Sequence, residues 1–501
     1  MATLLRPHSL QPDPSLGEEA LERGKRYIVQ DAAWASLVGA LYGGVILTGF
    51  ALELGASPFV IGVLAAIPFL MQVMQLPAIV LIERVRQRRK VAVIVVSAAR
   101  LIILSLALLP LLDDAPLQLE LLVGAQLLIT FFGAFAGCAV NSWLHQLLAG
   151  QPIGQLYAQR LFWSTVLAAL GALLAGQLIE HWPLGERLHA YSASFAAAGI
   201  AGFVGVVFLS RVPEPVMRDT GPAKPLLALL SAPFRDANFR KVIIFMGSWN
   251  FAANLAAPFL TVYLLQQLGY GLGTVTSLWA AGQVANALTL FLWGRLSDGL
   301  NNKGILAVAL PTWFASLIAL PASALPDVHL LTLPILYVIH VTMGMANAGI
   351  GLATGNLGLK LAPQGQGTAF LATVTLVGAF SGGIASLLGG LLATWFAARE
   401  LIFVIQWYSP ARVTQLTALE FVHWEFLFAL SFLAGMYVMH ALTRIREGEE
   451  VSERRVIQQF AVEAARAFEQ MSSMTIATLA AIFPFGRLFD RRRRNRATSA
   501  P

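Results

Sequence analysis

The stretch WGRLSDGLNNKG, residues 293–304, joins two long apolar segments through a loop with room only for a tight turn. Gly294 has no Cβ, so its helix can approach a neighbouring helix closely. Asp298 follows four residues later at the predicted helix end, between the basic residues Arg295 and Lys303. The stretch therefore combines a close helix contact with a charged turn.

The composition of the whole chain places this turn in a membrane protein. Of 501 residues, 57% are hydrophobic and 12% are charged, against about 25% charged residues in soluble domains. A helical crossing needs about 20 mainly apolar residues. Segments of this kind begin near Asp31, Ser57, Val91, Leu119, Leu161, Ala190, Val242, Thr274, Ile305, Leu330, Thr368 and His423. The predicted fold class is an all-α polytopic membrane protein with twelve transmembrane helices.

The basic residues predict the orientation. An even number of crossings leaves both termini on one side, and the cytoplasmic side of a membrane protein carries the excess of Lys and Arg. With the termini inside, every Lys and Arg is cytoplasmic except Arg100, within a helix, and Arg187, Arg399 and Arg412. We predict a multi-pass protein of the plasma membrane, such as a bacterial inner membrane. The net charge of +7 then indicates anionic lipid at the cytoplasmic face and not nucleic acid.

The chain divides at a proline-rich segment. Residues 211–241 are predicted to be a cytoplasmic linker between six-helix halves at 31–210 and 242–444, flanked by a cytoplasmic segment at 1–30 and a tail at 445–501. Similar residues recur at an offset near 215: Trp34 with Trp249, Glu83 with Asp298, Asn141 with Asn356, and Leu173–Gly176 with Leu387–Gly390. Such an offset predicts two pseudo-symmetric halves.

The opening turn resembles a loop signature of the major facilitator superfamily, which recurs between the second and third helices of each half. Four positions agree in the second half, Gly294, Leu296, Asp298 and Lys303. In the first half, Ile79 and Glu83 stand in place of the glycine and the aspartate. The resemblance implies a secondary or facilitative transporter that works by alternating access. We expect a cytoplasmic gate at the helix ends, formed by Glu83, Arg84, Arg88, Gly294, Arg295, Asp298 and Lys303.

Polar and aromatic residues within the predicted helices are candidates for the substrate site, because unpaired polar groups in a membrane tend to face the protein interior or a cavity. All fall on helices that line the central cavity in the resembled family. They are Trp34, Tyr42, Gln72, Asn141, Trp249, Asn250, Asn254, Gln283, Asn286, His340 and Asn347. Each amide has the alternative of a structural hydrogen bond between helices. For Asn250 and Asn254, one turn apart beside Trp249, we favour the cavity.

Ionisable groups at depth are few. Only His340 and Arg100 are expected deep in the membrane, with the carboxylates near helix ends. A histidine titrates near neutral pH, so His340 is a candidate for proton coupling, with a packing role as the alternative and another co-ion still open. For Arg100, pairing with a helix carbonyl or a carboxylate is favoured over substrate binding.

Enzyme motifs are absent from the sequence: neither GxxxxGK[ST], HExxH nor GxSxG occurs. Cys138 is the single cysteine, which excludes an internal disulfide. We expect a monomer without enzyme activity, cofactor or metal, bound to a small-molecule substrate. Neutral amides with Trp and Tyr suit a neutral hydroxylated solute such as a sugar. The alternatives are export of an amphipathic drug-like or lipid-like compound, or a non-transporting membrane assembly or pigment-delivery factor.

The tail is predicted to lie on the membrane surface. Apolar residues recur there at helical spacing, at Val456, Ile457, Phe460, Ala464, Phe468 and Met471. Residues 474–489 are apolar but short and precede four consecutive arginines, as in an interfacial segment held by anionic lipid.

The orientation is testable by cysteine labelling in a Cys138→Ser background. Asp114→Cys and Asp327→Cys should react with a membrane-impermeant maleimide added outside intact cells, because both lie in loops opposite the basic residues. Labelling only after the cytoplasmic face is exposed would overturn the predicted orientation.

Overall fold

The computed structural model describes residues 10–13, 16–151, 154–183, 186–217, 226–299, 301–325, 327–363, 367–409, 412–447 and 453–472. Within these residues, 12 helical segments are long and apolar enough to cross a membrane, which confirms the prediction. The first six are α1 (Glu18–Tyr42) with α2 (Gly44–Glu53), α3 (Pro58–Leu70) with η2 (Met71–Met74) and α4 (Gln75–Val85), α5 (Arg88–Leu106) with η3 (Leu109–Leu111), α6 (Ala115–Leu147), α7 (Gly154–Glu180) and α8 (Arg187–Leu209). Helix α1 begins at Glu18, well before the start at Asp31 that hydropathy predicts.

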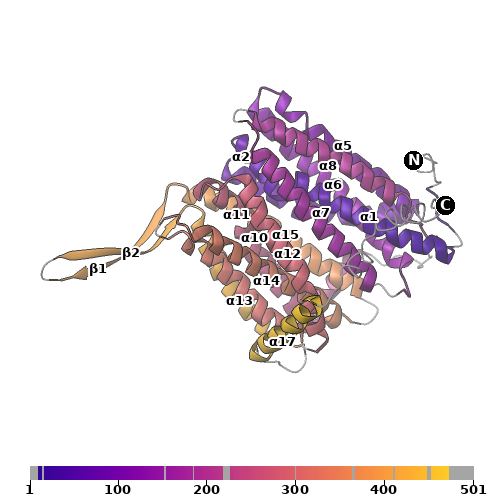
Figure 1. Ribbon diagram of the computed structural model, residues 1–501. Coiled ribbons are helices and arrows are strands. Elements are labelled where there is room, and N and C mark those ends of the chain that lie inside the picture. The colour runs from indigo at the N-terminus through magenta and orange to yellow at the C-terminus, as the bar shows by residue number, and fades with distance from the viewer. Residues whose placement is uncertain are drawn as a thin grey trace, which may run out of the picture.

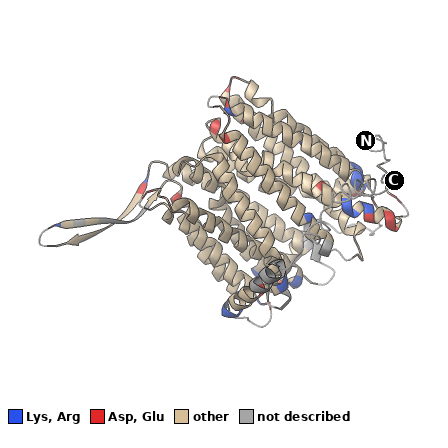
Figure 2. Cartoon of the chain, in the orientation of Figure 1, with Lys and Arg blue, Asp and Glu red and all other residues tan. Residues whose placement is uncertain are grey.

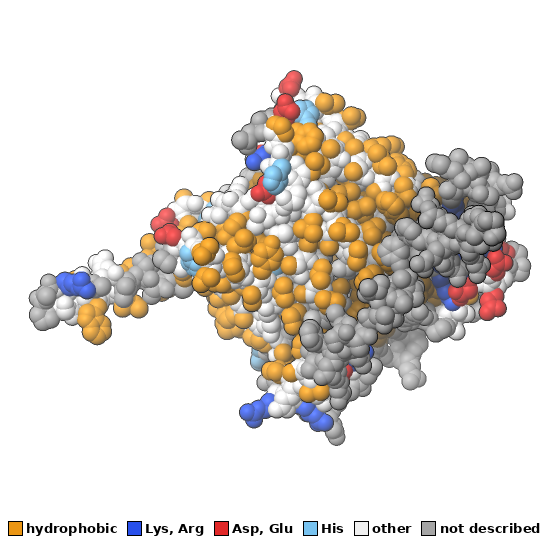
Figure 3. All heavy atoms as spheres, viewed as in Figure 1, with side chains coloured by type: hydrophobic (Ala, Val, Ile, Leu, Met, Phe, Trp, Pro, Cys, Tyr) orange, Lys and Arg blue, Asp and Glu red, His pale blue; other side chains and the backbone are white. Residues whose placement is uncertain are grey.

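The second half repeats this order. Its spans are α10 (Ala237–Ala256) with η4 (Ala257–Phe259), α11 (Leu260–Val262) and η5 (Tyr263–Gln267), then α12 (Leu272–Gly299), α13 (Asn302–Ala322), α14 (Thr332–Leu361), α15 (Gly367–Phe396) and α16 (Glu425–Thr443). The protein is thus an integral, multi-pass membrane protein. Hydrophobic side chains cover the flank of the helical body (Figure 3).

Two spans are interrupted at equivalent positions of the halves. The first breaks at Gly43 and Gly44, where Gly44 has φ 54°, a left-handed conformation that favours glycine. The seventh breaks at η4, which contains Pro258. Gly43 and Pro258 are 215 positions apart, the offset of the predicted repeat. Both breaks leave irregular backbone at depth, which a membrane protein tolerates where the backbone is buried or lines a cavity.

The bundle has two distinct ends (Figures 1 and 2). We call the end with residues 10–13, the start of the linker and helix α17 (Glu453–Ser472) the basic end, because Lys and Arg gather there in Figure 2. The opposite end, which carries a long β-hairpin, is the hairpin end. In Figure 1 the two halves meet near the hairpin end and diverge toward the basic end.

The halves meet through α3 against α15 and α7 against α12. At the first contact a Cβ on Gly62 would lie 2.6 Å from the Ser386 carbonyl oxygen and 3.1 Å from Gly390 Cα. At the second, a Cβ on Gly176 would overlap Thr276. The Glu180 carboxylate also accepts a hydrogen bond from Gly273 N at 2.5 Å. These contacts lie toward the hairpin end and require small residues.

The β-hairpin is absent from the all-α prediction. Strands β1 (Glu400–Tyr408) and β2 (Val413–Val422) pair antiparallel, and every residue of β1 is exposed. The prediction left this segment as a loop between spans, although its β-branched and aromatic residues favour a strand. His423 (φ 47°) turns the chain into α16, and its ring stacks on Trp424 at 3.9 Å between centroids. Burial lowers the pKa of His423 from its ordinary value.

Two further helices lie outside the spans. Helix α9 (Leu226–Arg235) lies within the predicted linker. Helix α17 confirms the helix predicted after the last crossing: Val456 is buried, and the Phe460 ring packs against Trp293 of α12 at 4.6 Å. The predicted interfacial segment at 474–489 lies outside the described residues.

Replacing residues 402–420 by a short Gly-Ser turn should leave the helical body intact, because β1 is exposed along its whole length. We expect the free energy of unfolding to change by less than about 0.5 kcal/mol, measured by thermal unfolding in detergent. Loss of the folded protein would show that the hairpin supports the bundle.

Candidate functional site

A cavity of about 420 Å³ lies between the halves, within the range of small-molecule sites. Its lining comes from the first, second and fourth spans of one half and the equivalent seventh, eighth and tenth spans of the other. Both span interruptions take part, through Gly44 and Val45 on one side and Ala257 and Pro258 on the other. The breaks therefore place irregular backbone against the cavity, as expected.

Three of the predicted site residues line this cavity, Gln283, His340 and Asn347. Helices α12 and α14 bring them together by crossing at Gly282 and Gly344, where a Cβ on Gly344 would overlap the Gly282 carbonyl. The His340 ring is fixed by a contact of 2.8 Å between Nδ1 and the Leu336 carbonyl. Because a carbonyl only accepts, Nδ1 carries the proton and Nε2 remains for a second interaction.

A fourth predicted residue reaches the cavity through a partner. Tyr42 Oη donates a hydrogen bond to Gln126 Oε1 of α6, and Gln126 lines the cavity. The prediction omitted Gln126, together with the lining residues Thr48, Thr261 and Trp279. An amide within the apolar stretch of α6 is the signal that identifies Gln126; the threonines and Trp279 have none of comparable strength.

Other predicted residues do not line the cavity, and those of α10 are the main example. Trp249 packs edge-on against Trp313 of α13, with ring centroids 5.2 Å apart. Asn250 and Asn254 donate back to Met246 O and Asn250 O of their own helix, at 2.8 and 2.9 Å. Both also pack against glycines of α15. In this conformation, both amides are bonded within α10, and neither lines the cavity.

The remaining candidates are dispersed. Trp34 packs against Gly205 of α8. Gln72 accepts a hydrogen bond from Gln75. Asn141 is exposed on α6, and Asn286 is partly buried one turn from Gln283. None of the four lines the cavity.

A partly buried cluster of charged residues includes Asp31 of α1. The sequence predicts that Asp31 lies near a helix end. The structure corrects this, because α1 begins at Glu18 and Asp31 therefore lies well inside the helix. It interacts electrostatically with Arg100 of α5 and Arg160 of α7. Arg100 packs against Gly202 of α8. The pairing of Arg100 with a carboxylate stays a prediction, for which Asp31 is the candidate partner.

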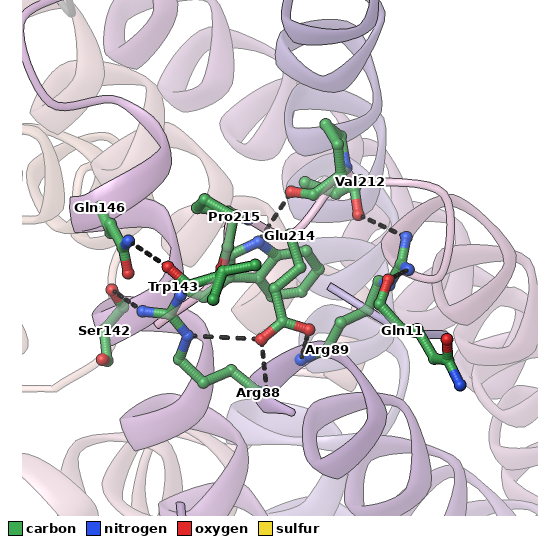
Figure 4. Close-up of polar contacts among 11 residues, drawn as sticks. Gln11, Arg88, Arg89, Ser142, Trp143, Gln146, Val212, Glu214 and Pro215 are labelled. Carbon is green, nitrogen blue, oxygen red and sulfur yellow. Dashed lines mark hydrogen bonds and ion pairs between the residues drawn. The ribbon is translucent and has the colours of Figure 1, made fainter. Parts of the chain in front are cut away.

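At the basic end, Glu214 joins three segments of the first half (Figure 4). Its carboxylate accepts hydrogen bonds from the backbone N–H groups of Arg88 and Arg89, at 2.6 and 3.1 Å, and pairs with Arg88 Nε at 3.4 Å. The Arg88 guanidinium also donates to Ser142 O of α6 and to Pro215 O, at 3.2 and 2.9 Å. Glu214 is fully buried. We call this arrangement the Glu214 clamp; it ties α5 to α6 and to the chain after α8.

The second half contains a matching Glu447 clamp. Glu447 accepts from the N–H groups of Asn302 and Lys303 at 3.1 and 2.7 Å, at the start of α13. Lys360 of α14 pairs with Glu447 at 3.2 Å. In both halves a glutamate that follows the sixth span thus binds the N-terminus of the third, where the helix dipole favours a carboxylate.

A profile of the Major Facilitator Superfamily matches residues 32–386, which is most of the chain. The chain belongs to the Major Facilitator Superfamily. No curated protein sequence matches it. Solved structures with the same fold include a mutant of the nucleoside transporter NupG, with a TM-score of 0.62 and 14% identity, covering 85% of this chain and 100% of that one. A bacterial homologue of the human lysosomal transporter Spinster, in an inward-facing and unoccupied conformation, has a TM-score of 0.56 and 15% identity. The match covers 76% of this chain and 84% of that one.

A third structure, a POT family transporter in complex with 5-aminolevulinic acid, has a TM-score of 0.59 and 13% identity. The match covers 87% of this chain and 98% of that one. At these identities the structures share the fold alone. Together with the family match they show a membrane transporter of the Major Facilitator Superfamily type.

The contacts described for the predicted gate residues of this superfamily member lie within their own halves or go to α17. Arg88 and Lys303 belong to the two clamps, each inside its own half. Arg295 pairs with Glu463 of α17 at 3.6 Å. The close helix contact expected at Gly294 is missing here, since a Cβ there would meet nothing within 4 Å. Glu83 and Arg84 are exposed at the end of α4, and the Asp298 side chain lies outside the described residues.

Glu214→Gln should destabilise the first half, because it removes the charge that balances the buried Arg88 guanidinium. Breaking a buried pair costs about 3–5 kcal/mol, to be measured by denaturant unfolding in detergent. Arg88→Gln added to Glu214→Gln should restore part of the loss. Glu19→Gln, in an exposed pair with Arg23, is the control and should cost less than about 0.5 kcal/mol. Equal effects of Glu214→Gln and Glu19→Gln would contradict the clamp.

Proposed function

We propose that this chain moves a neutral small organic solute across the membrane by alternating access, with the cavity between the halves as its binding site. The observation that carries the proposal is the composition of the lining. The described lining residues combine apolar side chains with three amides, a histidine and two threonines, and none of them carries a carboxylate, an ammonium or a guanidinium. A charged solute would lose its hydration there without a counter-charge.

The polar groups suit a hydroxylated or amide-bearing solute. Gln126, Gln283 and Asn347 offer donors and acceptors from both halves, and Trp279 offers an aromatic face. A solute held between them would contact both halves at once. A sugar-like compound therefore remains our preferred substrate class. The NupG structure is titled a nucleoside transporter, so nucleosides belong in the same screen.

The orientation of the bundle follows from its charges. We place the basic end in the cytoplasm, because cytoplasmic loops carry the excess of Lys and Arg. The halves then meet at the outer end, through the Gly62 and Gly176 contacts. Such a conformation is the one expected of an inward-facing state.

A substrate can be found by a thermal-shift screen of the purified protein and confirmed by flux in proteoliposomes. Gln283→Leu should lower uptake about 10-fold, because one hydrogen bond to the solute is lost. Asn286→Leu is the matched control, since it changes an amide one turn away that does not line the cavity. Equal transport by both variants would remove Gln283 from the site.

The same assays distinguish the alternative functions. Export of an amphipathic compound would appear as outward flux. An assembly factor would show no flux and would copurify with a partner.

His340 is the proposed proton carrier, because it lines the cavity and its Nε2 is not engaged by the Leu336 carbonyl. Because the charge of a histidine can change between about pH 5 and pH 8, wild-type uptake should rise as the external pH is lowered across this range. His340→Gln cannot titrate, so its uptake should not vary over this range. A variant that keeps the wild-type pH profile would show that another group carries the proton or that transport is uncoupled.

A further inference from the structure

The basic end of the second half contains an open pocket of about 590 Å³. It is lined by residues from the ends of α10, α13 and α16 and the segment after α16, namely Lys241, Lys303, Thr443, Arg444, Ile445, Arg446 and Glu447. Four of the seven are basic and one is acidic. The pocket is distinct from the central cavity and takes no part in the proposed solute site.

The single carboxylate of this pocket is already engaged. Glu447 accepts hydrogen bonds from two backbone N–H groups, from Asn302 Nδ2 and from Lys360 Nζ. Among the described residues, no ion pair joins Lys241, Arg444 or Arg446 to a carboxylate. Counted over the described residues, the side chains that line the pocket therefore carry a net positive charge.

The equivalent pocket of the first half shows how such a charge is balanced. That pocket has a volume of about 460 Å³, and its lining includes Arg89, Arg211 and Glu214. Counted from the clamp of each half, these three residues correspond to Lys303, Arg444 and Glu447 of the second pocket. Residues 11–13 of the same chain also line it, together with Ala20, Arg23, Tyr27 and Pro213. Gln11 O accepts from Arg89 Nη2 at 2.8 Å, and Asp13 N donates to Glu214 O at 2.8 Å.

The same segment brings a negative charge into the first pocket. The Asp13 carboxylate interacts electrostatically with Arg89, and Asp13 forms a parallel bridge with Pro215. An extended peptide thus forms part of the wall of the first pocket and adds one carboxylate to it. No described segment takes this place in the second pocket.

The second pocket lies at the ends of membrane-spanning helices, where lipid headgroups are expected. Lys241 is in the first turns of α10, Lys303 is the second residue of α13 and Thr443 is the last residue of α16. Ile244, one turn from Lys241 toward the membrane centre, is 47% exposed. A phosphate in the pocket would lie beside an apolar surface for an acyl chain. Basic pockets between transmembrane helices at the cytoplasmic face are suited to anionic headgroups.

We propose that this pocket binds the phosphate of an anionic phospholipid, which replaces in the second half the carboxylate that Asp13 supplies in the first. Lys241, Arg444 and Arg446 hold the phosphate, and Arg446 is positioned by its backbone, which exchanges hydrogen bonds with the Asn238 side chain at 3.0 and 3.2 Å. The bound lipid links α10 to the segment after α16 at the basic end. It therefore stabilises the second half as a unit.

The test is lipid binding to the full-length protein in detergent, followed by native mass spectrometry and thermal shift with phosphatidylglycerol. Arg444→Gln with Arg446→Gln should weaken binding about 25-fold, a factor of about five for each charge. Arg454→Gln with Arg455→Gln is the matched control, because it removes two exposed arginines of α17 at the same end of the bundle. The control should bind phosphatidylglycerol as the wild type does. Lys241→Gln alone, with an expected loss of about five-fold, serves if the double variant does not fold.

Two further arms identify the source of the phosphate. Phosphatidylcholine should give no thermal shift, and millimolar inorganic phosphate should not reproduce the shift given by phosphatidylglycerol. A full shift with inorganic phosphate would overturn the lipid assignment. Wild-type affinity in both the Arg444/Arg446 and the Lys241 variants would overturn the site itself.

Discussion

The architecture depends on one contact between backbones, where Gly62 of α3 meets Gly390 of α15. Each glycine excludes a Cβ: on Gly62 it would lie 3.1 Å from Gly390 Cα, and on Gly390 it would lie 2.9 Å from the Pro58 carbonyl oxygen. In a membrane, helices gain little from burying apolar surface, so association rests on such close packing. The contact closes the hairpin end, and the cavity lies below it between the broken spans. A bulkier residue at either glycine would separate the halves at this end.

Each half is stabilised internally at the other end by its own clamp. Glu214 and Glu447 each neutralise the N-terminus of a third span and connect it to the fourth and to the chain after the sixth. Because these bonds lie within the halves, they are compatible with movement of one half against the other. This division suits alternating access, in which the halves move as units around the site. The proposed lipid site adds a connection within the second half and none between the halves.

The architecture could be predicted well from the sequence, because the positions of the helices follow from the distribution of apolar residues along the chain. The twelve spans, the two halves and a helix after the last span follow from hydropathy, an offset of 215 and helical periodicity, and the structure shows them. The placement of that last helix on the membrane surface stays a prediction. Gln283, His340 and Asn347 could be identified because polar groups are costly in apolar helices. The face of a helix is harder to assign. Trp249 and Asn250 occupy a span that lines the cavity, yet they pack against α13 and α15, and helical periodicity carries no information about which neighbour a side chain meets. Glu214 lies in a loop, where hydropathy gives no signal.

The central claim is that the two ends of the bundle open in alternation, and paired spin labels measure it without a known substrate. In a Cys138→Ser background in nanodiscs, one pair at Val85 and Leu359 reports on the basic end and another at Asp114 and Asp327 on the hairpin end, all at exposed positions. Double electron–electron resonance is then compared between this background and the same protein with Gly62→Leu. The account predicts that Gly62→Leu lengthens the hairpin-end distance and shortens the basic-end distance. The fraction of molecules that shows the longer hairpin-end distance should equal the fraction that shows the shorter basic-end distance. A longer hairpin-end distance with an unchanged basic-end distance would contradict it.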